Sequence, residues 1–281
     1  MEPERPGSAL RSMLEIDIIT LFPGMFRGPF DESIIRRAAD GGLVKITVHD
    51  LRDYTDDRRR TVDDKPYGGG GGMVMMPGPV FKAVRKLEKS SSRVIFVSPQ
   101  GKRFDQRMAE ELSREEHLLL LCGYYEGVDE RVRALLVSDE ISIGDFILTG
   151  GSLAAMIVVD AVTRLLPGAV GEPLSVENDS FTSGLLDYPS YTRPPEFEGS
   201  RVPEVLLSGD HEAIRRWRKK EALKRTAARR PDLLRSYGFT EEERALMKEA
   251  EAELAAARQG HGPEPGEGSR GRKKAATETR E

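Results

Sequence analysis

Short apolar runs rich in β-branched residues and leucine alternate along the chain with segments whose apolar residues recur at helical spacing. The runs predict strands at Glu15–Leu21, Val44–His49, Arg93–Val97, His117–Cys122 and Val137–Ile143. The intervening segments predict helices at Asp31–Ala39, Gly78–Leu87, Asp105–Leu112 and Val128–Leu135. Strands that alternate with helices are typical of an α/β fold with a largely parallel sheet.

The second half of the chain follows a different pattern. A strongly apolar helix is predicted at Ser152–Leu166, where Pro167 and Gly168 stop it. Residues 169–200 are rich in Gly, Pro, Ser and acids without a sustained period, which indicates a long interdomain linker of the kind that is often functional. We therefore predict a disordered extension at 1–12, a first domain at 13–168, the linker, a small helical domain at 201–258 and a disordered tail at 259–281.

Composition narrows the class of protein. The chain has 281 residues, 38% hydrophobic residues and a net charge of -4, which favours a soluble globular protein. No apolar run approaches the roughly 18 residues of a membrane helix, and the start has no apolar signal segment, so we expect a cytoplasmic protein. Cys122 is the single cysteine and ends an apolar run, so we interpret it as a small buried side chain rather than a nucleophile. The four widely spaced histidines do not favour a metal site.

A basic segment stands out after the linker. Between Ile214 and Arg230 the chain has nine cations against Glu221 alone. A solvated helix face is the ordinary interpretation, but acids that would pair with these cations four residues away are missing, which favours phosphate binding. The candidate contacts are Arg215, Arg216, Lys219, Lys220, Arg229 and Arg230.

Glycines mark the segment Leu121–Ser152. They stand at the ends of short apolar runs beside acids and aromatics, and they permit turns and close backbone approach, so we predict a pocket built of main chain. A second run, Gly68–Gly72, fits neither the dinucleotide-binding nor the P-loop template. It follows the mixed-charge segment Arg58–Tyr67, which predicts a loop that closes over an anionic substrate.

Several short motifs, in order between about Met13 and Arg235, together resemble the bacterial tRNA (guanine-N1)-methyltransferase family, TrmD. They are Leu21-Phe22-Pro23, Thr61 to Gly70, Ser98-Pro99-Gln100-Gly101, Tyr125 to Arg131, Ser142-Ile143-Gly144-Asp145, Glu177 to Phe181 and Tyr191-Thr192-Arg193-Pro194. Each motif is weak alone, but their common order makes the resemblance specific.

The resemblance implies a fold and a cofactor that periodicity alone does not. The fold is that of SPOUT methyltransferases, in which 13–168 forms a catalytic domain with a deep trefoil knot and works as a homodimer with a composite active site. Main chain of the knot loops would hold S-adenosylmethionine, and the reaction would place a methyl group on N1 of guanosine 37 of tRNA. The implied cofactor-binding residues are Ser98, Pro99, Gln100, Gly123, Tyr125, Glu126, Ile143, Gly144, Asp145, Phe146, Ile147, Leu148, Gly150 and Gly151.

The chemistry requires a base and a cation. Neutral guanine carries a proton on N1, which must leave before that nitrogen can attack a methyl group. By resemblance Asp179 is the general base and Arg164 stabilises charge on guanine O6, while the linker folds over the cofactor when tRNA docks. Taken alone, Arg164 is explained equally by an ion pair with Asp160, and Asp179 by a helix cap or turn.

Two alternative functions remain open, and four residues depart from the usual pattern of the family. The chain could instead modify another RNA position or a ribose 2′-hydroxyl, or bind RNA without catalysis. The resemblance also implies an assisting Mg²⁺, for which no acidic cluster identifies a site. Against the usual family pattern, Gly71 replaces proline, Tyr124 arginine, Phe146 tyrosine and Ser152 glutamate.

Overall fold

The computed structural model describes residues 12–171 and 179–260, which form two compact units. The first unit extends to residue 178 and the second begins at Asp179. Each unit is described by itself. The division falls inside the predicted linker, and Leu185 and Tyr188 of that segment pack in the core of the second unit. The predicted disordered ends lie almost entirely outside the described residues.

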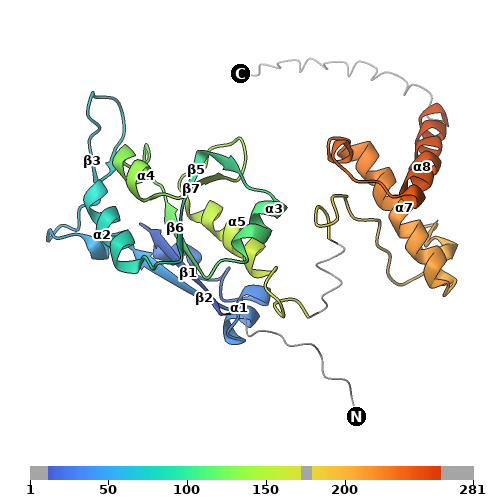
Figure 1. Ribbon diagram of the computed structural model, residues 1–281, viewed down its shortest axis with the longest axis horizontal. Coiled ribbons are helices and arrows are strands. Elements are labelled where there is room, and N and C mark those ends of the chain that lie inside the picture. Colours follow the sequence, from blue (N-terminus) through green and yellow to red (C-terminus); the bar gives the residue numbers. More distant parts are fainter. Residues whose placement is uncertain (1–11, 172–178, 261–281) are drawn as a thin grey trace, which may run out of the picture. The chain divides into compact units, whose positions relative to one another are not determined.

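A five-stranded sheet in which every pairing is parallel forms the centre of the first unit (Figure 1). Its strands are β1 (Leu14–Thr20), β2 (Val44–Asp50), β5 (Ser92–Arg103), β6 (His117–Cys122) and β7 (Asp139–Ser142), in the order β2-β1-β6-β5-β7. The helices are α1 (Ser33–Asp40), α2 (Pro77–Leu87), α3 (Gln106–Leu112), α4 (Glu130–Leu136) and α5 (Ser152–Thr163). The α/β prediction and all of its strands and helices are confirmed, with ends that differ by a few residues apart from the end of β5.

Helices cover both faces of this sheet. Helices α1 and α3 contact α5, which packs on β1 and β6, whereas α2 contacts α4. Figure 1 shows these two groups on opposite sides of the strands. The central strand β6 is buried along its whole length, as a continuous apolar run in a two-sided sheet should be.

Strand β5 continues beyond its predicted end at Val97. It runs to Arg103 through Ser98–Gly101, the motif whose first three residues the resemblance implies in cofactor binding. Its register against β7 shifts between Val97 and Lys102, both of which lie opposite Ile141, so the strand bulges outward there. A Cβ atom on Gly101 would lie 2.4 Å from the backbone of Glu140, which explains why glycine occupies this bulge.

Some short elements were not predicted because two to four residues carry no period. They are the 3-10 helices Pro23–Phe26 and Leu51–Tyr54 and the hairpin of β3 (Asp63–Asp64) and β4 (Val74–Met75). The hairpin encloses the glycine run. The amide of Met75 donates to the carbonyl of Gly127 (2.9 Å), and that of Asp129 to the carbonyl of Met75 (3.1 Å). These bonds attach the glycine-run loop to the segment after β6.

The second unit is built on two helices, α7 (His211–Arg229) and α8 (Glu241–Gly260), which lie where the small helical domain was predicted. A small hairpin of β8 (Glu196–Phe197) and β9 (Ser200–Arg201) and the 3-10 helices Glu204–Leu207 and Leu233–Arg235 complete it. Its core contains Leu185, Ala222, Leu223 and Leu246. Helix α8 starts with a capping box of Thr240 and Glu243 and runs two residues into the predicted tail.

Candidate functional site

A cavity of about 280 Å³ lies at the carboxyl ends of the central strands, beside the start of α5. Most of its wall comes from three segments, those that follow Val97, Cys122 and Ile141. Thirteen of the fourteen predicted cofactor-binding residues line it: Ser98, Pro99, Gln100, Gly123, Tyr125, Glu126, Ile143, Gly144, Phe146, Ile147, Leu148, Gly150 and Gly151. The exception, Asp145, is exposed outside this wall. Three loops from distant parts of the sequence therefore meet, and two of them belong to the glycine-marked segment Leu121–Ser152.

Two of these loops touch through their main chains. The amide of Gly151 donates to the carbonyl of Gly123 over 2.8 Å. A Cβ atom on Gly151 would lie 2.9 Å from Cys122 Cα and from the Gly123 nitrogen, and one on Gly150 would lie 2.2 Å from the ring of Tyr124. Any larger residue would force the loops apart, so close contact between the backbones of the two loops determines the shape of the cavity.

The backbone is also unusual at other positions of the cavity wall. Gly127 and Gly144 have φ angles of 126° and 144°, a region that residues with a side chain rarely enter. Tyr125 adopts a φ of 59° although it has a side chain. Strained residues of this kind concentrate at binding and catalytic sites.

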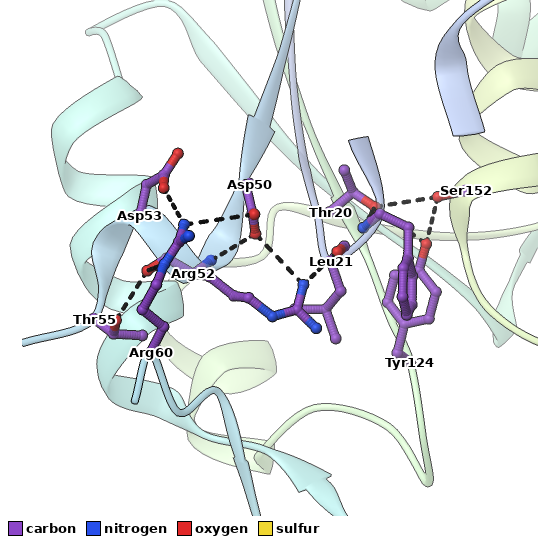
Figure 2. A network of polar contacts seen from close by, with 10 residues as sticks. Thr20, Leu21, Asp50, Arg52, Asp53, Thr55, Arg60, Tyr124 and Ser152 are labelled. Atoms are coloured by element: carbon purple, nitrogen blue, oxygen red, sulfur yellow. Dashed lines mark hydrogen bonds and ion pairs between the residues drawn. The ribbon is translucent and has the colours of Figure 1, made fainter. Parts of the chain in front are cut away.

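Two departures from the family pattern, Tyr124 and Ser152, are in contact with each other (Figure 2). Both hydroxyls also hydrogen-bond with Thr20 Oγ1, at 3.1 Å from Tyr124 and 3.2 Å from Ser152. All three side chains are buried, and burial raises the pKa of the Tyr124 phenol. A neutral hydroxyl cluster therefore joins the end of β1, the segment after β6 and the start of α5 without burying a charge.

A second cluster in Figure 2 belongs to the segment before the glycine run. The guanidinium of Arg52 donates to the carbonyl of Leu21 and lies 5.6 Å from the ring centre of Phe22. Arg60 pairs with Asp53 and, at 3.6 Å, with Asp50. Arg60 is the last of three consecutive arginines and is thus tied to the fold. The two before it, Arg58 and Arg59, are exposed.

The two predicted catalytic residues belong to different units. Arg164 follows the last residue of α5, and its amide donates to the carbonyl of Asp160. The 12 residues of α5 span about 18 Å, so Arg164 stands a helix length from Gly151 and does not line the cavity of its own chain. Asp179 is half-buried in a turn whose Thr182 amide donates to its carbonyl. The adjacent Glu177 and Asn178 of the predicted motif lie outside the described residues.

Cys122 is buried, as predicted. Its side chain has no exposed surface, and burial raises the pKa of the thiol to about 12. The thiolate needed for nucleophilic attack is therefore strongly disfavoured. In the described ranges 12–171 and 179–260, no group of three or more His, Cys, Asp or Glu side chains could hold a metal ion. No helix of the same ranges is long and apolar enough to cross a membrane.

Acids from α8 neutralise much of the basic segment. Within α7 acids are few, as the sequence analysis noted, but the neighbouring helix supplies them. The pairs are Arg215 with Glu242 (2.8 Å), Arg216 with Glu249 (2.8 Å), Lys219 with Glu243 (3.0 Å) and Lys220 with Glu253 (2.7 Å). Arg230 pairs with Asp232 (2.7 Å), whereas no ion pair within the described chain involves Arg229. Acids of α8 thus take the place of the acids that α7 lacks at a spacing of four residues, so their absence from α7 does not by itself indicate phosphate binding. Contact of these six residues with RNA stays a prediction.

Several residues of the cavity were not predicted. Phe96, Val97, Ile141 and Ala154 look like ordinary core positions in the sequence, and only the end of their strand or helix exposes them to the cavity. Arg133 also lines it, donates to Gln100 Oε1 (3.0 Å) and pairs with Glu140 (2.6 Å). No local pattern distinguishes this arginine from other helical cations.

Comparison with known proteins agrees with the motif order. The family model described as "tRNA (Guanine-1)-methyltransferase TrmD" matches residues 14–236. A tRNA (guanine-N(1)-)-methyltransferase of Dictyoglomus turgidum is 59% identical over 242 residues, which cover 86% of this chain and 98% of that protein. The corresponding protein of Geobacillus kaustophilus is 54% identical (85% and 99% covered), and that of Pelotomaculum thermopropionicum is 56% identical (86% and 98% covered).

Proposed function

This chain belongs to the TrmD family of tRNA (guanine-N1)-methyltransferases, and we propose that it transfers a methyl group from S-adenosylmethionine to N1 of guanosine 37 of tRNA. The observation that carries the proposal is the cavity, which collects thirteen of the fourteen residues expected to hold the cofactor. Its position at the carboxyl ends of parallel strands is the usual place for a ligand in an α/β sheet.

The lining of the cavity supports S-adenosylmethionine as the methyl donor. Apolar walls from Phe96, Val97 and Leu148 suit an adenine ring, and main-chain amides and carbonyls of the three loops suit its polar edge. The glycines at 150 and 151 form a cradle that a Cβ atom would fill. When bound, this cofactor supplies a methyl group on a positively charged sulfur.

We place these loops in a deep trefoil knot, as the family resemblance implies. Support comes from two places where main chain packs directly on main chain. Gly151 packs against Cys122 and Gly123, and Gly101 packs against Glu140 and Ile141. Segments that pack at such distances leave no room for a side chain between them.

Asp179 and Arg164 carry the proton chemistry in this proposal. Asp179 accepts the proton from guanine N1, and Arg164 stabilises the negative charge that develops on O6. A positioned general base typically contributes about 10² to 10⁴ in rate. A carboxylate is a weak base for this proton in water, so exclusion of water from Asp179 when tRNA docks is part of the mechanism.

A second copy of the chain completes the active site in this proposal. Because Arg164 stands about 18 Å along α5 from Gly151, it is remote from the cavity of its own chain. Leu153 and Ile157 lie one helical turn apart on α5 and are 46% and 47% exposed, which gives this helix an apolar stripe for a partner. Antiparallel pairing of two such helices would bring the Arg164 of each chain to the cavity of the other.

The second unit is the proposed tRNA-binding domain. Arg229 and Arg230 are exposed at the end of α7. The other four predicted contacts, Arg215, Arg216, Lys219 and Lys220, would exchange carboxylates of α8 for phosphates.

Methylation of tRNA transcripts tests the proposal. With labelled S-adenosylmethionine, a transcript with guanosine 37 should be methylated and one with adenosine 37 should not. Asp179→Asn should lower the rate by about 10² or more while calorimetry gives an unchanged cofactor affinity. Full activity of this variant would refute the assigned base, and mass spectrometry that finds a ribose methyl group would refute the assigned position.

Mixed dimers test the composite site. Asp179→Ala and a variant with a blocked cavity, Gly151→Val, should each be inactive as pure dimers. If Asp179 serves the cavity of the partner, the mixed dimer contains one intact site and activity returns on mixing. If it serves its own cavity, both sites of the mixed dimer are defective and no activity returns.

A further inference from the structure

The cations of α7 are distributed unevenly between two faces. An α-helix turns by about 100° per residue, and by this spacing the cations that pair with α8 lie together on one side of α7. Arg218, Arg225 and Arg229 follow at spacings of seven and four residues, so they share the opposite side. No ion pair within the described chain involves these three arginines. The excess positive charge of this helix therefore points away from α8.

A pocket of about 570 Å³ opens on that side, wholly within the second unit. One wall is the segment from Tyr188 to Arg193, and the other includes Leu207, Ile214 and Arg218. Tyr191 lines the pocket and is 49% exposed, and its ring centre lies 6.4 Å from that of Trp217. We call this the tyrosine–arginine pocket.

The chemistry of the tyrosine–arginine pocket suits a flat anionic ligand. The guanidinium of Arg218 lies 5.0 Å from the ring centre of Tyr188, and Arg193 adds a second exposed cation. None of the residues that line the pocket is acidic. Exposed tyrosine rings stack on unpaired nucleobases, and arginines bind the phosphates beside them.

We propose that the tyrosine–arginine pocket holds one unstacked nucleobase of the tRNA substrate, with Tyr191 against the base and Arg193 and Arg218 on a flanking phosphate. This inference rests on the proposed function, since it takes tRNA as the substrate. It adds to the second unit an RNA contact on the side of α7 that faces away from α8. Stacking is tolerant of sequence, so the pocket contributes affinity and orientation rather than a choice of base.

The first test compares two charge-removing variants of the same helix. Arg218→Gln removes a cation of the pocket, and Lys224→Gln removes a cation that pairs with Glu253 on the opposite side (2.6 Å). Tryptophan fluorescence or filter binding measures tRNA affinity at several salt concentrations. Arg218→Gln should weaken binding by about tenfold and lower the salt slope by about one, whereas Lys224→Gln should stay within twofold of the unmodified protein.

The second test reports the stacking itself. With 2-aminopurine placed in turn at unpaired positions of the tRNA, one position should be quenched on binding, and Tyr191→Ala should abolish that quenching and raise the KM for tRNA by about tenfold. Tyr191→Phe keeps the ring and should restore both. kcat at saturating tRNA and the affinity for S-adenosylmethionine should change little.

The outcomes separate this inference from the function on which it rests. If Tyr191→Ala and Arg218→Gln bind tRNA as the unmodified protein does, or if Lys224→Gln weakens binding equally, the pocket has no such role although methylation continues. If the unmodified protein fails to methylate tRNA, the proposed function itself is wrong. Because Tyr191 and Arg218 are exposed, circular dichroism of the variants should show intact helices.

Discussion

Replacement of Gly151 by alanine should open the cofactor cavity. The φ angle of Gly151 is -74°, which alanine adopts freely, so the substitution tests close packing alone. The new Cβ atom would lie 2.8 Å from a methyl group of Val97 and 2.9 Å from two backbone atoms of residues 122 and 123. Carbon atoms prefer separations of about 3.5 to 4.0 Å, so the two loops must move apart by at least about 0.5 Å.

The magnitude follows from the same geometry. Overpacking of a well-packed interior typically costs about 1–3 kcal/mol, and separation also stretches the 2.8 Å hydrogen bond between Gly151 and Gly123. Movement of the cavity wall should weaken the binding of the cofactor by a similar free energy. Since 1.4 kcal/mol is a factor of ten, the affinity for S-adenosylmethionine should fall by about 5- to 150-fold.

Calorimetry with S-adenosylmethionine measures this effect, and Gly78→Ala is the matched control. Gly78 lies in α2, where a Cβ atom would meet nothing within 4 Å, so alanine there should leave the affinity within twofold and the melting temperature unchanged or raised. If Gly151→Ala binds the cofactor as tightly as Gly78→Ala does, the reasoning that backbone contact shapes the cavity is wrong.

Three further predictions concern side chains away from the cofactor. Tyr124→Phe removes one hydroxyl of the buried cluster but leaves the bond between Thr20 and Ser152, so thermal unfolding should show a loss of about 1 kcal/mol. Burial alone would raise the pKa of Glu243, but hydrogen bonds from Thr240, Tyr237 and Lys219 outweigh it and lower the pKa from 4.5 to about 2. A carboxyl group with a lowered pKa stabilises the fold above its unfolded value, so this contribution, at most about 3 kcal/mol, should disappear between pH 4.5 and 2. Glu243→Gln should lower stability near pH 7 and flatten that acid dependence in urea unfolding; an unchanged acid profile would contradict the assignment. Cys122 should react with a thiol reagent only at the rate of unfolding, and rapid labelling of the native protein would show that the buried thiol is accessible.

The amino-acid sequence by itself determined the parts of this protein that depend on local order. Alternation of apolar runs and helical periods predicted the strands and helices of the parallel α/β sheet, because each element buries its own apolar face. The glycines of Leu121–Ser152 predicted a pocket built of main chain, because only glycine permits such close approach, whereas the loop at Ser98–Gly101 was implied by the family resemblance alone. Motif order identified the family.

Tertiary structure decided everything that joins distant residues. The hydroxyl cluster links Thr20 to Ser152 across 132 positions, and the acids that neutralise α7 come from another helix about 30 residues away. The bulge of β5 depends on its register against β7. Charge and size can be read from a sequence, but the partner of a side chain is set by how the elements pack, and only that packing revealed which arginines of α7 have no ion pair within the described residues.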